Sequence, residues 1–129
     1  MFKSIRTSEF NKQIITELTT KLGFGVENII ARIAFAYSLK NDGRLNLEDI
    51  QDSKGKEYSK NVLFGEYSYI YIALICQNYK IYKSNKEIPR YIKMHIDNGL
   101  AALYENVSQD GIEFLIGEIE GSLAEDKLF

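Results

Sequence analysis

The sequence has few of the residues that build catalytic and metal sites. Its 129 residues include one histidine, one cysteine and no tryptophan. Because Cys76 has no second cysteine to pair with, no internal disulfide can form, and nothing indicates an oxidising compartment. A structural zinc site needs about four Cys or His ligands, so Cys76 and His95 alone exclude one within a single chain.

Long apolar runs are also missing. A membrane-spanning helix needs roughly 18 to 20 consecutive apolar residues, and no segment of the sequence reaches that length. The first residues, Met1 to Arg6, mix charged with apolar side chains and lack the apolar stretch of a signal peptide. We therefore expect a cytoplasmic protein.

The apolar residues that are present suffice for one core. Hydrophobic residues make up 45% of the chain and aromatic residues 12%, while 26% are charged and can cover the surface. A chain of this length fits a single domain. We predict one domain over residues 1–129.

Apolar residues recur at helical spacing over about 8–22, 26–40 and 88–105, which predicts three helices there. Thr7 or Ser8 can cap the first of them, and Gly23 suits the left-handed conformation that ends helices. Gly99 would let a neighbouring element approach the third helix closely. After a polar turn, a last helix with acids on its outer face is expected over about 111–124.

The run from Tyr67 to Tyr82 is apolar almost all round and rich in residues that favour strands. Periodicity alone does not separate a central strand from a buried helix here, but about 16 residues are long for a strand. We favour a central helix, in which the tyrosines pack in the core rather than stack on bases.

Residues 41–65 are polar and irregular, and we interpret them as a long ordered loop with one helical turn near 47–50. Residues 2–7 alternate as a short strand would. The predicted fold is therefore all-α, a compact bundle of about five helices, to which a short N-terminal strand could be added as in ribbon-helix-helix proteins.

Charge is segregated along the chain although the net charge is only -2. Residues 1–104 hold 15 Lys and Arg against 11 Asp and Glu, whereas residues 105–129 hold one lysine against seven acids. Electrostatic fields act within about a Debye length, so residues 1–104 and residues 105–129 can attract different partners. The sequence predicts a mildly basic body with an acidic C-terminal end.

Reactive groups that could converge are scarce. A Cys76 and His95 nucleophile pair is conceivable, but a cysteine in an apolar run is usually an inert buried hydrophobe. The segment from Asp42 to Asp49 resembles half of a calcium loop, yet its register puts Lys40 among the ligands. Gly23-Phe24-Gly25 lacks the third glycine of a dinucleotide fingerprint. We expect no catalytic site, cofactor or metal.

Basic residues gather at places where they could meet a polyanion. Lysine and arginine bind phosphates and release counterions, which needs only a positive surface of suitable shape. The candidates for DNA contact are Lys54, Lys56 and Lys60, then Lys80, Lys83, Lys86, Arg90 and Lys93, and at the N-terminus Lys3 and Arg6. The competing interpretation is an ordinary solvated face.

The order strand, helix, glycine turn, helix at the N-terminus is also that of ribbon-helix-helix regulators, whose paired strands enter the major groove. Lys3 and Arg6 would then be candidate contacts in the groove, although they fall on opposite faces of the strand. A third hypothesis is a protein-protein adaptor whose acidic last helix docks a basic partner.

Several short blocks occur in an order that resembles one known family, the DndE proteins of DNA sulfur modification. They are Leu22-Gly23-Phe24-Gly25, Ile30-Ala31-Arg32-Ile33-Ala34, Ser53-Lys54-Gly55-Lys56-Glu57, Leu63-Phe64-Gly65-Glu66 and His95-Ile96-Asp97-Asn98-Gly99-Leu100. Together they span roughly residues 8–105. Each block is short, so the resemblance is specific only because all of them occur in the same order.

The resemblance implies a helical, non-catalytic subunit that acts with other Dnd proteins in DNA phosphorothioation, where sulfur replaces a non-bridging phosphate oxygen. It also implies self-association, to a tetramer, and affinity for DNA with a preference for nicked duplex. It does not identify which lysines touch DNA, so the contacts named above rest on charge placement.

Overall fold

The protein is mostly helical, as the sequence predicts. The computed structural model describes residues 2–23 and 26–110 of the chain. The helices are α1 (Glu9–Leu22), α2 (Glu27–Asp42), α3 (Lys60–Phe64), α4 (Ser68–Tyr79) and α5 (Ile88–Asp110), the 3-10 turns are η1 (Leu47–Asp49) and η2 (Gly65–Tyr67), and the strands are β1 (Ser4–Arg6) and β2 (Glu57–Ser59). The acidic helix predicted over 111–124 lies outside the described residues.

Helix α1 begins and ends at the residues that its sequence suggests. The Ser8 hydroxyl accepts a hydrogen bond from the Asn11 N–H and so caps the first turn. At the other end Gly23 has a φ of 67°, in the left-handed region, and its N–H donates to the Thr19 carbonyl. The predicted cap and stop are both confirmed.

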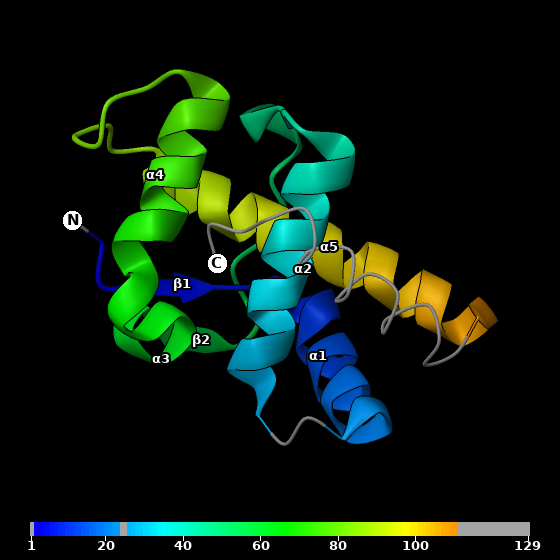
Figure 1. Ribbon diagram of the computed structural model, residues 1–129. Coiled ribbons are helices and arrows are strands. Elements are labelled where there is room, and N and C mark those ends of the chain that lie inside the picture. Colours follow the sequence, from blue (N-terminus) through cyan, green and yellow to red (C-terminus); the bar gives the residue numbers. More distant parts are fainter. Residues whose placement is uncertain (1, 24–25, 111–129) are drawn as a thin grey trace.

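The core forms where α2 crosses the long helix α5, with α1 and α4 against its flanks (Figure 1). Phe35 of α2 and Ile92 and Ile96 of α5 are fully buried there. A Cβ added to Gly99 would lie 1.9 Å from the Ala34 carbonyl oxygen, so the two backbones meet at a distance that only glycine allows. The predicted close approach at Gly99 is confirmed.

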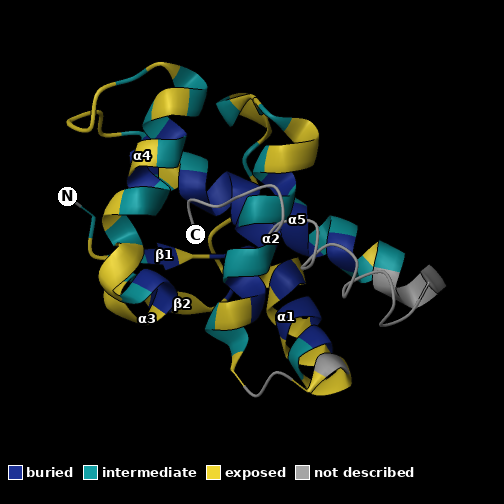
Figure 2. Ribbon diagram, in the orientation of Figure 1, coloured by how far each residue is buried: buried dark blue, intermediate teal, exposed yellow. Residues whose placement is uncertain are grey.

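Helix α4 is a helix, as favoured, but it is not central. Of its residues only Ile72 and Ile75 are buried, and Figure 2 shows exposed and half-buried turns along its length. Tyr67 and Tyr69 are 56% and 66% exposed, so the prediction that they pack in the core is wrong. Their neighbours behave as predicted: Tyr71 stacks on Phe64 at 4.2 Å between ring centroids.

The segment 41–65 is more regular than a loop. It contains the predicted helical turn, η1, but also β2, which pairs antiparallel with β1 so that Ile5 lies opposite Tyr58. Both side chains are buried, which attaches the ribbon to the core. Because β1 finds its partner within the same chain, the ribbon-helix-helix hypothesis loses the free strand on which it was based.

Candidate nucleic-acid interface

The ribbon of β1 and β2 brings together basic residues that are more than 50 positions apart in the sequence. The Lys60 N–H donates to the Lys3 carbonyl at 2.9 Å, and the Thr7 N–H donates to the Lys56 carbonyl at 3.0 Å. The N-terminal candidates therefore lie beside those of residues 41–65, the segment that the sequence predicted as a loop. Lys3 and Lys60 mark one end of the ribbon, and Lys56 marks the other.

The segment after α4 is an ordered turn that carries lysines into solvent. Lys80 ends α4 with a φ of 55°, and the Ile81 N–H donates back to the Cys76 carbonyl. A second turn follows, in which the Asn85 N–H donates to the Tyr82 carbonyl at 2.9 Å. The Asn85 side chain then accepts from the Glu87 N–H, which leads the chain into α5. The three exposed lysines of this loop are Lys80, Lys83 and Lys86.

The loop and the ribbon meet at the N-terminus. Phe2 lines a shallow groove together with Lys83 and Lys86, and the loop and the N-terminus lie on the same side of the molecule in Figure 1. The next residue, Lys3, is hydrogen-bonded through its backbone to Lys60. We name the combined surface the basic patch; its members are Lys3, Lys60, Lys80, Lys83 and Lys86.

Four of the other candidates, Arg6, Lys56, Arg90 and Lys93, form ion pairs. Arg6 donates to Glu57 at 3.2 Å and Arg90 donates to Glu87 at 2.5 Å, and the basic side chains of both pairs are about half exposed. Exposed pairs of this kind are worth about 0 to 1 kcal/mol, so a phosphate can compete for Arg6 or Arg90.

Lys56 is held more firmly. It donates to Glu27, which is less exposed than the lysine and also accepts from Tyr58. Burial raises the pKa of Glu27, but the hydrogen bonds from Lys56, Tyr58 and Thr16 outweigh it and leave that pKa below the ordinary value. Glu27 is therefore ionised and neutralises Lys56 at physiological pH.

Lys54 is exposed but stands apart from the basic patch. Its segment is anchored by Asp52, which accepts from the N–H groups of Glu9 and Lys54 at 3.0 Å each. These backbone hydrogen bonds hold the pKa of Asp52 below its usual value. The adjoining Gly55 is buried where a Cβ would lie 2.1 Å from the Ser8 carbonyl oxygen, which fixes the approach of this segment to α1.

Lys93 was predicted to contact DNA, but it is buried, so this prediction is wrong. Its side chain is only 6% exposed, and its ammonium donates to Asp97 Oδ2 at 2.5 Å. The other Asp97 oxygen accepts from the Ser8 N–H and the Asn11 amide. The sequence places Lys93 in a basic run, but its helix turns that side chain inward, where it neutralises a buried carboxylate that organises the start of α1.

His95 is fully buried and its two ring nitrogens are both engaged. Nε2 lies 2.6 Å from the Tyr79 hydroxyl, which also accepts the Leu45 N–H, and Nδ1 lies 2.8 Å from Ser38 Oγ, which also accepts from the Asn98 amide. Burial lowers the pKa of His95 to about 4, so the ring is neutral at pH 7. With both nitrogens occupied, His95 does not serve Cys76 as a base.

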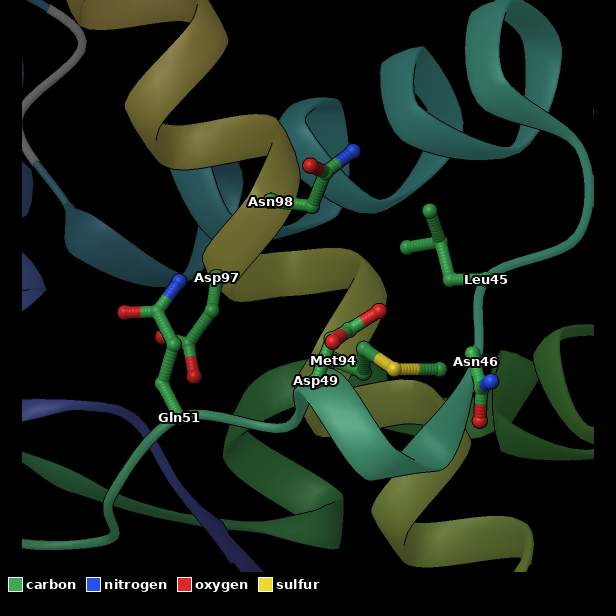
Figure 3. Close-up of a pocket in the computed structure, with 7 residues that line it drawn as sticks. All are labelled: Leu45, Asn46, Asp49, Gln51, Met94, Asp97 and Asn98. Carbon is green, nitrogen blue, oxygen red and sulfur yellow. The ribbon is translucent and has the colours of Figure 1, made fainter.

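A small pocket lies between η1 and α5 (Figure 3), and its lining includes Asp49 of η1, Gln51 just after it, and Met94 and Asp97 of α5. Its volume is about 90 Å³, whereas pockets for small ligands usually measure about 300 to 1,000 Å³. Asp97, its most buried acid, already holds Lys93. This pocket offers no room for a nucleotide.

Residues 2–23 and 26–110 contain no group of three or more His, Cys, Asp or Glu side chains placed to hold a metal ion. They also contain no helix that combines the length and the apolar character needed to cross a bilayer.

The comparisons with known proteins agree with each other. A family model described as DNA sulphur modification protein DndE matches residues 4–110. The fold is similar to the crystal structure of DndE from Escherichia coli B7A involved in DNA phosphorothioation modification, with a TM-score of 0.65 and 22% identity over 80% of this chain and 98% of that one. It is equally similar to a DndE mutant in which two glycines are replaced by lysines, with a TM-score of 0.67 and the same identity and coverage. No curated protein matches.

Proposed function

Because the chain belongs to the DndE family of DNA sulfur modification proteins, we propose that it is the non-catalytic DNA-binding subunit of a bacterial phosphorothioation complex. In this proposal the basic patch binds phosphates, and partner Dnd subunits carry out the sulfur chemistry. A cytoplasmic location follows from the proposed ligand, bacterial chromosomal DNA.

The observation that carries the proposal is the joining of the ribbon and the loop into one basic patch. Phe2 lines one groove with Lys83 and Lys86, and the backbone carbonyl of the next residue, Lys3, accepts from the Lys60 N–H, so three separate stretches of sequence meet there. Within the described residues the acid nearest to them in sequence, Glu87, is already paired with Arg90. Duplex DNA carries one negative charge per about 1.7 Å of its axis, so several closely spaced cations can each replace a condensed counterion.

The scarcity of convergent reactive groups supports the non-catalytic role. His95 is neutral and bonded on both sides, and Lys93 and Asp97 neutralise each other in the interior. These groups stabilise the fold rather than face a substrate.

We also propose that the protein self-associates, as a tetramer, and that it prefers nicked duplex, because both properties are what the family resemblance implies. An apolar surface suited to association is available on α3, η2 and α4, where Val62, Tyr67 and Tyr69 are exposed.

The proposal is tested by measuring affinity for nicked and intact duplex across a salt series. Each lost phosphate contact reduces the slope of log K against log salt by about 0.9. A Lys83→Ala and Lys86→Ala double variant should therefore lower the slope by about 2 and weaken binding at low salt.

Lys12→Ala is the matched control, since Lys12 is an exposed lysine of α1 outside the basic patch. It should leave the slope unchanged to within a few tenths of a unit. A wild-type protein that binds neither duplex at low salt, or an affinity that does not depend on salt, would refute the proposed function.

A further inference from the structure

Tyr82 is the most exposed large apolar side chain of the described residues, at 86%. Single exposed apolar side chains are normal on protein surfaces, so the meaning of this ring depends on what surrounds it. Tyr82 packs against none of the core residues. Its place in the fold is the first corner of the turn that Asn85 closes.

The surroundings of this ring are positive. Lys80 precedes it by two residues, Lys83 follows it directly, and Lys86 lies across the same turn. The adjacent acid, Glu87, is neutralised by Arg90 at 2.5 Å. Charge complementarity therefore favours a polyanion over an ordinary protein surface as the occupant.

The residues that follow Tyr82 in the same loop line a groove. Its lining combines the apolar residues Phe2, Ile88 and Pro89 with the polar residues Ser84 and Asn85 and the lysines Lys83 and Lys86. The volume is about 290 Å³, near the lower end of the range for small-ligand pockets. A nucleobase is flat, apolar on its faces and polar at its edges, which matches this lining.

From these features we propose that the loop from Lys80 to Glu87, with Phe2, is a binding site for an unpaired DNA base, which stacks on Tyr82 while the loop lysines hold the flanking phosphates. A positive track combined with an exposed aromatic ring is the arrangement by which proteins hold single strands without reading sequence. This inference rests on the proposed DNA-binding function and adds a preference for unstacked bases over intact duplex.

The loop is built to present the ring. Three hydrogen bonds restrain the backbone on both sides of the tyrosine. The Asn85 N–H donates to the Tyr82 carbonyl, the Glu87 N–H donates to the Asn85 side chain, and the Ile81 N–H donates to the Cys76 carbonyl. A restrained loop loses little conformational entropy when a base stacks on it, so more of the stacking energy appears as affinity.

A single-tryptophan reporter tests the contact directly. The chain has no tryptophan, so Tyr82→Trp introduces one indole whose fluorescence a stacked base quenches. A short homothymidine single strand should quench it strongly, and a blunt duplex of the same length should quench it weakly. Phe10→Trp is the control, because Phe10 is also exposed, at 69%, but lies on α1 outside the basic patch.

Affinities measured by anisotropy of the labelled oligonucleotides separate stacking from charge. Tyr82→Ala should weaken binding of the homothymidine strand by about tenfold, whereas Tyr82→Phe, which keeps the aromatic face, should retain it. The salt slope should stay that of the wild type in both variants, because the lysines remain. Duplex affinity should change by less than about twofold.

The outcomes distinguish the two proposals. If the wild type binds neither oligonucleotide, the DNA-binding function itself fails. If the wild type binds both but Tyr82→Ala binds the single strand equally well and the reporter is not quenched, only the base-stacking site is refuted. Loss of self-association in Tyr82→Ala with unchanged DNA affinity would assign the ring to a protein interface and also overturn the inference.

Discussion

At the scale of single residues, two buried polar groups, Asp97 and His95, hold neighbouring helices together. Asp97 joins α5 to the start of α1 by accepting from Ser8, Asn11 and Lys93. His95 joins α5 to α2 and α4 through Ser38 and Tyr79. Each group is satisfied by several partners, which is the condition under which a buried polar residue is tolerated.

His95 makes stability depend on pH. Its pKa of about 4 in the folded protein lies below the ordinary value of 6.5, so the unfolded chain binds the proton first. The contribution of His95 to the free energy of unfolding is therefore fully present above about pH 6.5. This contribution is lost progressively as the pH falls towards 4, by up to about 3 kcal/mol. Urea unfolding between pH 7 and 4 measures this loss, and His95→Gln should reduce it.

Because His95 is the only histidine of the chain, its imidazole resonances can be followed without assignment. They should titrate near pH 4 in the folded protein. A midpoint near 6.5 would show that the ring is not buried between Ser38 and Tyr79 as described.

Gly99 is constrained by the Ala34 carbonyl rather than by its own backbone. Gly99→Ala would bring a methyl group into that oxygen, and α2 and α5 would have to move apart, at a cost of about 1 to 3 kcal/mol or more. Gly43→Ala is the comparison: Gly43 has a φ of 58° but open space around it, so it should cost only about 1 to 2 kcal/mol of backbone strain. Thermal unfolding measures both, and a Gly99→Ala protein as stable as the wild type would contradict the close crossing.

At the scale of elements, sequence periodicity is most informative where one face of a helix is buried. Helices α1, α2 and α5 alternate between core and solvent at a period near 3.6, so their positions could be predicted. Strand β2 and helix α3 were missed because three and five residues are too short to show a period. The pairing of β1 with β2 joins residues more than 50 positions apart, and no local pattern encodes that contact.

Helix α4 shows the limit of using hydrophobicity to predict burial. Its sequence is apolar on every side, which indicates a central helix, yet its outer side faces solvent and carries Tyr69. The pattern records that a surface is apolar but not what covers it. In our proposal a second copy of the chain covers it.

The apolar surface of α3 and α4 should therefore control assembly. Tyr69→Glu places a charge on it and should shift the protein from oligomer to monomer, because an unpaired charge is costly to bury. Sedimentation velocity measures the shift. Phe10→Glu, at another exposed aromatic residue, is the control and should leave the oligomer intact; an unchanged sedimentation coefficient for Tyr69→Glu would remove this surface from the interface.

At the scale of the whole molecule, the fold determines which of the basic residues can contact DNA. The excess of lysine in residues 1–104 predicted a basic body, but charge placement alone selected ten candidates without ranking them. The fold separates them: five form the basic patch, Lys54 stands apart, Arg6, Lys56 and Arg90 are paired, and Lys93 is buried. The acidic segment after residue 110 lies outside the described residues, and its proposed adaptor role stays a prediction.

Lysine footprinting tests the central claim most directly. The protein is acetylated briefly with and without nicked duplex DNA, and modification of each lysine is read by mass spectrometry. The five lysines of the basic patch, Lys80 among them, should be protected by DNA, Lys12 should react equally in both samples, and Lys93 should react in neither. Equal modification of the basic patch with and without bound DNA, or protection centred on Lys12 instead, would contradict the account.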